Sequence, residues 1–126
     1  MSHMTEVSIS AATLQLADGE IYAGLVLTPE GTPSHHLVLL PGVAEDLTWQ
    51  AATDWAMAQG GALPTRQEQA LLYANAKAHF EGDWYWSGEE HTNGSYAWFQ
   101  YFGNGIQLTN RKSYEGRARA VRRLTA

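Results

Sequence analysis

The sequence predicts an α+β fold, in which two helices pack on a twisted antiparallel sheet behind an N-terminal β-hairpin. Three observations predict it: short apolar runs separated by turn residues over 13–42, two capped segments with helical spacing over 48–78, and short alternating segments over 84–124. With 126 residues, of which 44% are hydrophobic, the chain has the size and composition of a single domain.

A turn sequence near the N-terminus predicts the hairpin. Ala17-Asp18-Gly19-Glu20 separates two segments of strand composition, so residues 13–27 are expected to form two paired strands. Residues 29–34 form a second turn region. The apolar run over residues 35–40 then predicts a buried strand.

No linker composition divides the chain, and we therefore expect one domain over residues 1–126. Residues 1–4 contain Ser2-His3-Met4, which is typical of a cloning remnant. Residues 5–42 hold the expected hairpin and strand, and residues 43–126 hold the helices and the later strands.

Two helix starts are marked by threonine. Thr48 is expected to cap a helix over residues 49–59, because its hydroxyl can accept a hydrogen bond from a free amide of the first turn. Thr65 and Glu68 match a capping box at the start of a second helix over residues 66–78.

The rest of the chain predicts short strands and one tight turn. Strands are expected at residues 84–86, 95–102, 106–109 and 117–124, with Gly103-Asn104-Gly105 as the turn. In the first of these strands, alternation places Trp84 and Trp86 on one face and Tyr85 on the other. Trp98 is expected to lie in the core.

The order of motifs in the second half of the chain resembles the Lcl-type C-terminal domain, a family found in bacterial and prophage proteins. The resemblance covers residues 61–124 and rests on Leu63-Pro64-Thr65, Tyr85-Trp86-Ser87, Ala97-Trp98 and the terminal Arg119–Arg122. It implies a C-type-lectin-like core over residues 43–126. Domains of that fold serve several functions, so the resemblance by itself implies no single ligand.

Composition excludes several classes of site and protein. There is no cysteine, so disulfides, thiolate zinc sites and thiol nucleophiles are impossible. No apolar run reaches the roughly 18 residues of a membrane helix, and no signal-peptide pattern is present. We therefore expect no membrane insertion and a cytoplasmic location in the producing cell, with virion association as an alternative.

Charge is distributed unevenly along the chain. Six of the eight basic residues fall within residues 111–126, whereas twelve of the thirteen acids precede them. The basic segment is either an anion-binding edge or a set of partners for acids elsewhere in the fold. Because six charges fall short of a nucleic-acid-binding signature, no nucleic-acid partner is expected.

Two late polar segments are the candidates for a ligand-binding face. Residues 89–94 are expected to form a loop, and residues 101–114 a hairpin rich in Tyr, Asn and Gln, a composition typical of recognition surfaces. A solvated surface without a partner is the alternative for both segments, and core packing is the alternative for the aromatic residues. The predicted contact residues are Tyr85, Glu89, Glu90, His91, Asn93, Tyr101, Asn104, Gln107, Asn110 and Tyr114.

Neither a metal site, a cofactor nor a catalytic site is expected. Glu89, Glu90 and Asn93 supply too few oxygens for calcium, and the adjacent His35-His36 would face opposite ways on a strand. The segment Ser87–His91 contains a serine, a histidine and two acids, but no nucleophile-elbow pattern surrounds them.

These observations predict a non-enzymatic binding domain that recognises a protein, or a surface glycan, through residues 89–93 and 101–114, and the resemblance implies a phage or prophage origin. A protein partner is favoured because the calcium–sugar motifs of C-type lectins are absent and exposed aromatic and amide residues suit protein surfaces. Two alternatives remain: a small intracellular phage factor that inhibits or redirects a host protein, and an accessory module of a virion tail or baseplate.

Overall fold

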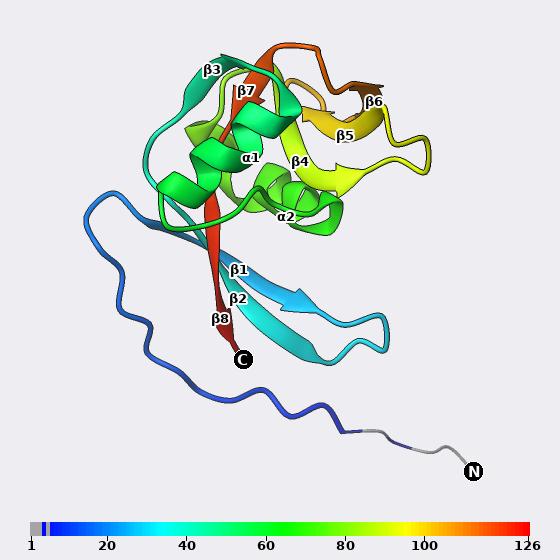
Figure 1. Ribbon diagram of the computed structural model, residues 1–126. Helices are drawn as coiled ribbons and strands as arrows, with labels where there is room; N and C mark the ends of the chain where they lie inside the picture. The colour runs from blue at the N-terminus through cyan, green and yellow to red at the C-terminus, as the bar shows by residue number, and fades with distance from the viewer. Residues whose placement is uncertain (1–3, 5) are drawn as a thin grey trace.

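The computed structural model describes residue 4 and residues 6–126, and over these residues the chain is an α+β protein (Figure 1). In chain order the elements are β1 (Ile21–Leu27), β2 (Pro33–Leu39), β3 (Ala44–Leu47), α1 (Trp49–Ala58), α2 (Arg66–Ala76), the short 3-10 helix η1 (Lys77–His79), β4 (Trp84–Glu90), β5 (Tyr96–Tyr101), β6 (Gln107–Arg111), β7 (Gly116–Ala118) and β8 (Val121–Thr125). Within the described residues, no helix has the length and apolarity needed to cross a membrane.

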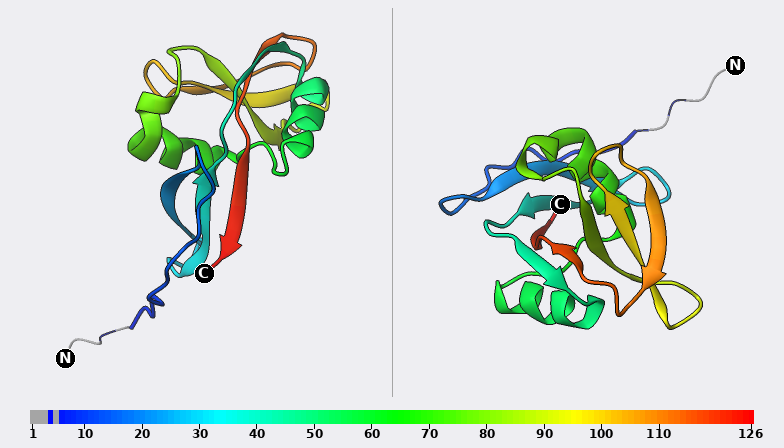
Figure 2. Two further views of the ribbon diagram at one scale, coloured as in Figure 1. Left: turned by 90° about the vertical axis from the view of Figure 1, so that its left-hand side faces the viewer. Right: turned by 90° about the horizontal axis from the view of Figure 1, so that it is seen from above.

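The strands form two sheets that meet near the helices. The smaller sheet has the order β1-β2-β8 and is antiparallel, so the C-terminal strand pairs with the N-terminal hairpin. The larger sheet has the order β3-β7-β4-β5-β6, in which only β4 and β7 run parallel. Figure 2 shows the smaller sheet extending away from the larger one, and α2 contacts strands of both.

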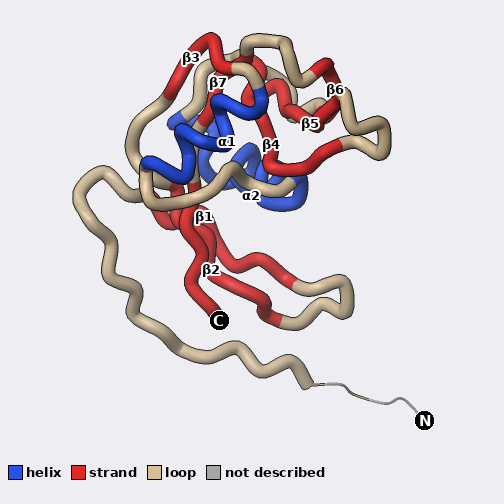
Figure 3. The backbone as a smooth tube through the Cα atoms, in the orientation of Figure 1, coloured by secondary structure: helices blue, strands red, loops and turns tan. Residues whose placement is uncertain are grey.

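The N-terminal hairpin lies one turn later than the sequence predicts. A turn is present at residues 17–20, but residues 13–16 form no strand and belong to the loop that leads into β1 (Figure 3). β1 pairs instead with β2, across the turn at residues 28–32. This pairing places Val26 and Leu37 together in the core, 5% and 0% exposed, and apolar burial of this kind is the main stabilising term in folding.

Both predicted helix starts are confirmed. Thr48 Oγ1 accepts a hydrogen bond from the Ala51 N–H at 3.3 Å, ahead of α1. The capping box of α2 is complete, because Thr65 Oγ1 accepts from the Glu68 N–H at 3.1 Å and Glu68 Oε1 accepts from the Thr65 N–H at 2.8 Å. α2 ends at Ala76, two residues before the predicted end, where the chain tightens into η1.

The core consists of two apolar clusters. One lies between the smaller sheet and α2, and the other lies between α1 and the larger sheet. Trp86 is fully buried in the second cluster. The rings of Trp84 and Trp86 both pack against the ring of Phe99, so these two tryptophans share a face as predicted. Tyr85 is only 2% exposed and belongs to the first cluster, so its predicted role as a contact residue is wrong: α2 covers its side of β4.

The predicted last strand over residues 117–124 is two strands in different sheets. β7 joins the larger sheet beside β3 and β4, whereas β8 joins the smaller sheet beside β2. The chain crosses between the sheets at Arg119 and Ala120, where the Ala120 carbonyl accepts a hydrogen bond from the Leu40 N–H at 2.9 Å. β3 is an edge strand that no sequence pattern predicted.

Candidate functional site

The first residue of α2 stacks on a tryptophan of β5. Trp98 is partly exposed, not buried as predicted, because it alternates with Phe99, which faces the core. The Arg66 guanidinium carbon lies 3.5 Å from the centre of the Trp98 ring, a close cation–π contact. Arg66 Nε also donates to Gln107 Oε1 at 3.2 Å, and Gln107 Nε2 donates to the Arg66 carbonyl at 2.7 Å. These bonds hold the guanidinium over the ring.

Two further rings extend this surface. The ring of His91 lies 5.9 Å from that of Trp98 and 6.5 Å from that of Tyr96, centre to centre. His91 Nδ1 accepts a hydrogen bond from the Asn93 N–H at 3.0 Å, which orients the imidazole. The partly exposed side chains that form this surface are named here the platform: Arg66, His91, Tyr96, Trp98 and Gln107.

A chain of glutamines connects the platform to the interior. Gln107 Nε2 donates to Gln100 Oε1 at 2.8 Å, and Gln100 Nε2 donates to the Gln69 carbonyl on α2 at 2.8 Å. Gln69 in turn donates to the Tyr85 carbonyl of β4 at 3.0 Å. Gln69 and Gln100 are 1% and 0% exposed. Because buried hydrogen-bonded amides are costly to disturb, this chain fixes the platform to both α2 and the sheet.

Three of the predicted contact residues come together at the platform. His91 and Gln107 belong to it, and Glu89 Oε2 accepts a hydrogen bond from the Arg66 N–H at 2.6 Å. That N–H is one of the free donors at the start of α2, where a carboxylate is favourable. Glu89 and Glu90 lie on β4, which runs on to Glu90, and not in the loop that the sequence predicts.

Three other predicted contact residues make bonds within the fold itself. Glu90 pairs with Lys112 Nζ at 3.0 Å. The side-chain oxygens of Asn93 and Asn104 each accept a hydrogen bond from the backbone two residues later, at 3.1 and 3.0 Å, and so hold their turns.

The remaining predicted contact residues lie on the opposite face of β5 from the platform. The ring of Tyr101 is 5.1 Å from that of Trp84, and the ring of Tyr114 meets Phe99 edge-on at 5.6 Å. Asn110 lies across from a buried alanine of β5 that faces this same side. The residues predicted to form one contact surface therefore lie on two opposite faces of the sheet, because side chains alternate along β5.

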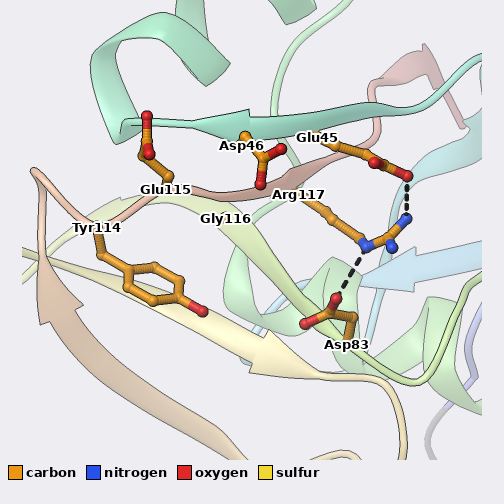
Figure 4. Close-up of a pocket in the computed structure, with 7 residues that line it drawn as sticks. All are labelled: Glu45, Asp46, Asp83, Tyr114, Glu115, Gly116 and Arg117. Carbon is orange, nitrogen blue, oxygen red and sulfur yellow. Dashed lines mark hydrogen bonds and ion pairs between the residues drawn. The ribbon is translucent and has the colours of Figure 1, made fainter.

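An acidic depression lies beside Tyr114. It encloses about 150 Å³ and is lined by Glu45, Asp46, Asp83, Tyr114, Glu115, Gly116 and Arg117 (Figure 4). Arg117 Nε donates to Asp83 at 3.0 Å and its Nη1 donates to Glu45 at 2.8 Å. The bond with Asp83 raises the pKa of Arg117. Four carboxylates around one guanidinium leave excess negative charge, which suits a small cationic group.

Four of the six basic residues within 111–126 contact acids of the fold itself, namely Lys112, Arg117, Arg122 and Arg123. Besides Arg117, Arg122 pairs with Glu20 through two hydrogen bonds of 2.9 Å, and Arg123 pairs with Glu68 through two of 2.7 Å. The hydrogen bond from Arg122 lowers the pKa of Glu20. Of the two interpretations of this segment, the contacts favour internal pairing over an anion-binding edge.

The serine and histidine of the segment at 87–91 are not arranged as a catalytic pair. Ser87 is buried, its hydroxyl donates to the Trp98 carbonyl at 2.8 Å, and it accepts from the Glu89 N–H at 3.1 Å. Over residue 4 and residues 6–126, no group of three or more His, Asp or Glu side chains is placed to hold a metal ion.

Sequence reasoning missed Arg66, Tyr96 and Trp98 as surface residues. The available signal was the alternation in β5, where Trp98 shares a face with the polar Gln100 while Phe99 shares one with an alanine. The stacking of Arg66 had no signal in the sequence, because Arg66 and Trp98 are 32 positions apart and meet only through the packing of α2 on the sheet.

A comparison of the chain with protein-family models finds no match, and a comparison with curated proteins finds none either.

Proposed function

We propose that this chain is a non-enzymatic binding domain that recognises a protein partner through the platform. The observation that carries the proposal is the guanidinium of Arg66, stacked at 3.5 Å on the partly exposed Trp98 and held there by Gln107. Tryptophan and arginine are the residue types that most often dominate binding energy at protein interfaces. Because these side chains are already ordered, less conformational entropy is lost on binding.

The stack also favours a protein over a surface glycan. A sugar ring would pack on an open face of an aromatic side chain, but Arg66 already covers one face of Trp98. A protein carboxylate or carbonyl, in contrast, can bond to the guanidinium edge while apolar atoms pack on the tryptophan. A surface glycan remains the second candidate ligand.

We further propose that the fold is C-type-lectin-like, as the resemblance to the Lcl-type domain implies. The pairing of the C-terminal strand β8 with the N-terminal hairpin, two helices, and a second sheet of later strands support this. A phage or prophage origin follows from the same resemblance. A host-directed factor and a virion accessory module would both use a protein-binding surface.

The proposal is tested with two variants at the platform and one matched control. Arg66→Ala and Trp98→Ala remove the stack, whereas Met57→Ala removes a side chain that is 68% exposed on α1. Each protein is used to capture partners from a host lysate and is applied to a glycan array, and affinity for any captured protein is then measured by calorimetry.

We expect a captured protein whose affinity falls at least tenfold with either platform variant and is unchanged by Met57→Ala. Circular dichroism must show that the variants remain folded. Equal affinity of all four proteins for the partner would place the interface elsewhere. Specific glycan binding that Trp98→Ala abolishes, with no captured protein, would overturn the protein assignment in favour of the glycan.

A further inference from the structure

Arg119 occupies the point where the chain crosses between the two sheets. Its Nη1 donates to the His79 carbonyl at the end of η1 at 2.6 Å, and its Nη2 donates to the Leu40 carbonyl just after β2 at 2.7 Å. These two bonds fix the orientation of the guanidinium. They are made to neutral groups, and so they do not neutralise its charge.

The guanidinium of Arg119 differs from its neighbours in having no acidic partner. Arg117, Arg122 and Arg123 each contact a carboxylate, whereas over residue 4 and residues 6–126 no ion pair involves Arg119. An arginine has five N–H donors, and among the residues that the structure describes the buried Nε of Arg119 has no acceptor. Burial lowers the pKa of Arg119, as expected for a cation removed from water without compensation. Arg119 is partly buried, and charged groups that are shielded from water are normally paired, so the absence of an acidic partner leaves uncompensated positive charge at this point.

The same guanidinium lines a pocket of about 210 Å³. Val43, Ala78, Phe80 and Tyr85 contribute apolar wall, and the Arg119 guanidinium carbon lies 5.4 Å from the centre of the Phe80 ring. His79 and Glu81 stand at the pocket as well, both exposed to solvent. The Glu81 carboxylate makes no ion pair with Arg119 among the described residues, and its backbone N–H is bonded to the Tyr85 hydroxyl at 3.0 Å. The pocket therefore combines the Arg119 guanidinium with apolar wall on one part of its lining and with His79 and Glu81 on another.

We propose that this pocket, the Arg119 pocket, binds a carboxylate carried on a small apolar or aromatic body. A carboxylate accepts two parallel hydrogen bonds from a guanidinium and supplies the missing negative charge. The volume is below the roughly 300 Å³ at which pockets for drug-sized ligands begin, so the occupant is a small acid or the terminal residue of a peptide. This site is independent of the platform and of the proposed function.

The test uses benzoate as the probe and benzamide, its neutral analogue, as the control ligand. Binding is followed by chemical-shift changes in the ¹⁵N-labelled full chain, including the side-chain Nε–H resonance of Arg119. Benzoate should produce saturable shifts at the pocket, with a dissociation constant on the order of 1 mM for a ligand of this size. Benzamide should produce none. A tripeptide ending in phenylalanine with a free carboxylate, compared with its amidated form, distinguishes a peptide end from a free small acid.

Two variants of Val43, which is 48% exposed, keep the test independent of any structural role of Arg119. Val43→Glu places a carboxylate beside the guanidinium and should weaken benzoate binding at least tenfold, whereas Val43→Gln, of equal size and without charge, should weaken it less than threefold. Shifts from neither benzoate nor the free-acid peptide would overturn the proposal. Equal shifts from benzamide, or equal binding of benzoate by the two Val43 variants, would do the same.

Discussion

Replacing Glu68 with glutamine tests how α2 is fastened to the smaller sheet. Glu68 is 1% exposed and its carboxylate accepts hydrogen bonds from three residues: the Thr65 N–H at 2.8 Å, His35 Nε2 at 2.6 Å, and Arg123 Nε and Nη2 at 2.7 Å each. His35 lies on β2 and Arg123 on β8, so one carboxylate joins two strands to the first turn of the helix.

The expected cost follows from these contacts. Removing one partner of a buried ion pair costs about 3–5 kcal/mol, because the other charge is left without compensation. The side chains of Arg123 and His35 are 35% and 20% exposed, so water can partly solvate them, and glutamine still offers an oxygen to the Thr65 N–H. We therefore expect Glu68→Gln to lower the free energy of unfolding by about 3 kcal/mol, and the melting temperature by roughly 9–15 °C.

Urea unfolding at pH 7, followed by tryptophan fluorescence, measures the loss. Glu90→Gln is the matched control, because the Glu90 carboxylate is 54% exposed in its pair with Lys112. Exposed pairs contribute little, so the control should change stability by less than about 1 kcal/mol. A loss in Glu68→Gln no larger than that in the control would refute the reasoning.

The pH dependence gives an independent check. Burial alone would raise the pKa of Glu68, but hydrogen bonds from Arg123, the Thr65 N–H and His35 outweigh it and hold that pKa below its ordinary value of 4.5. A carboxyl whose pKa is lowered on folding contributes stability that is present above 4.5 and is lost as the pH falls through the folded pKa. The stability difference between the native chain and Glu68→Gln should therefore be constant above about pH 5.5 and shrink below pH 4.5. A difference that widens on acidification would contradict the assignment.

Three further outcomes are expected. Thr65→Ala removes the cap of α2 and should lower the free energy of unfolding by about 1 kcal/mol in the same urea titration; an unchanged midpoint would mean that the hydroxyl does not cap. Trp86→Ala empties a fully buried site and should cost about 3–5 kcal/mol by thermal circular dichroism, and a loss under about 1 kcal/mol would place Trp86 outside the core. Millimolar calcium should leave the melting temperature unchanged, because the carboxylates of Glu89 and Glu90 already accept bonds from protein groups; a rise of several degrees that a chelator reverses would contradict this.

The parts of the fold that depend on neighbouring residues were predictable. Both helix starts follow from threonine hydroxyls and, for α2, from a glutamate three residues later, and each of these groups bonds to backbone in its own first turn. The glycine turn at 103–105 and the shared face of Trp84 and Trp86 are similarly local, and both are confirmed.

The predicted contact surface failed where its members depended on pairing between distant segments. Glu89, His91 and Gln107 do meet, but they do so around Arg66 and Trp98, which sequence reasoning assigned to a helix start and to the core. Whether a side chain of a short strand faces solvent or the interior depends on which element covers each side of the sheet, and alternation by itself cannot say which side that is.

The α+β class, the positions of the two helices and most of the strands follow from the sequence alone, because periodicity and capping act within a few residues. Three outcomes depend on the tertiary fold: β1 pairs with β2, residues 117–124 divide between two sheets, and among the described residues Arg119 has no acidic partner while its neighbours are paired. These outcomes depend on contacts between residues far apart in the chain, such as the hydrogen bond that the Leu40 carbonyl accepts from Arg119. Such contacts form when the two apolar clusters close, one against α2 and the other against α1, and no local pattern encodes the partner.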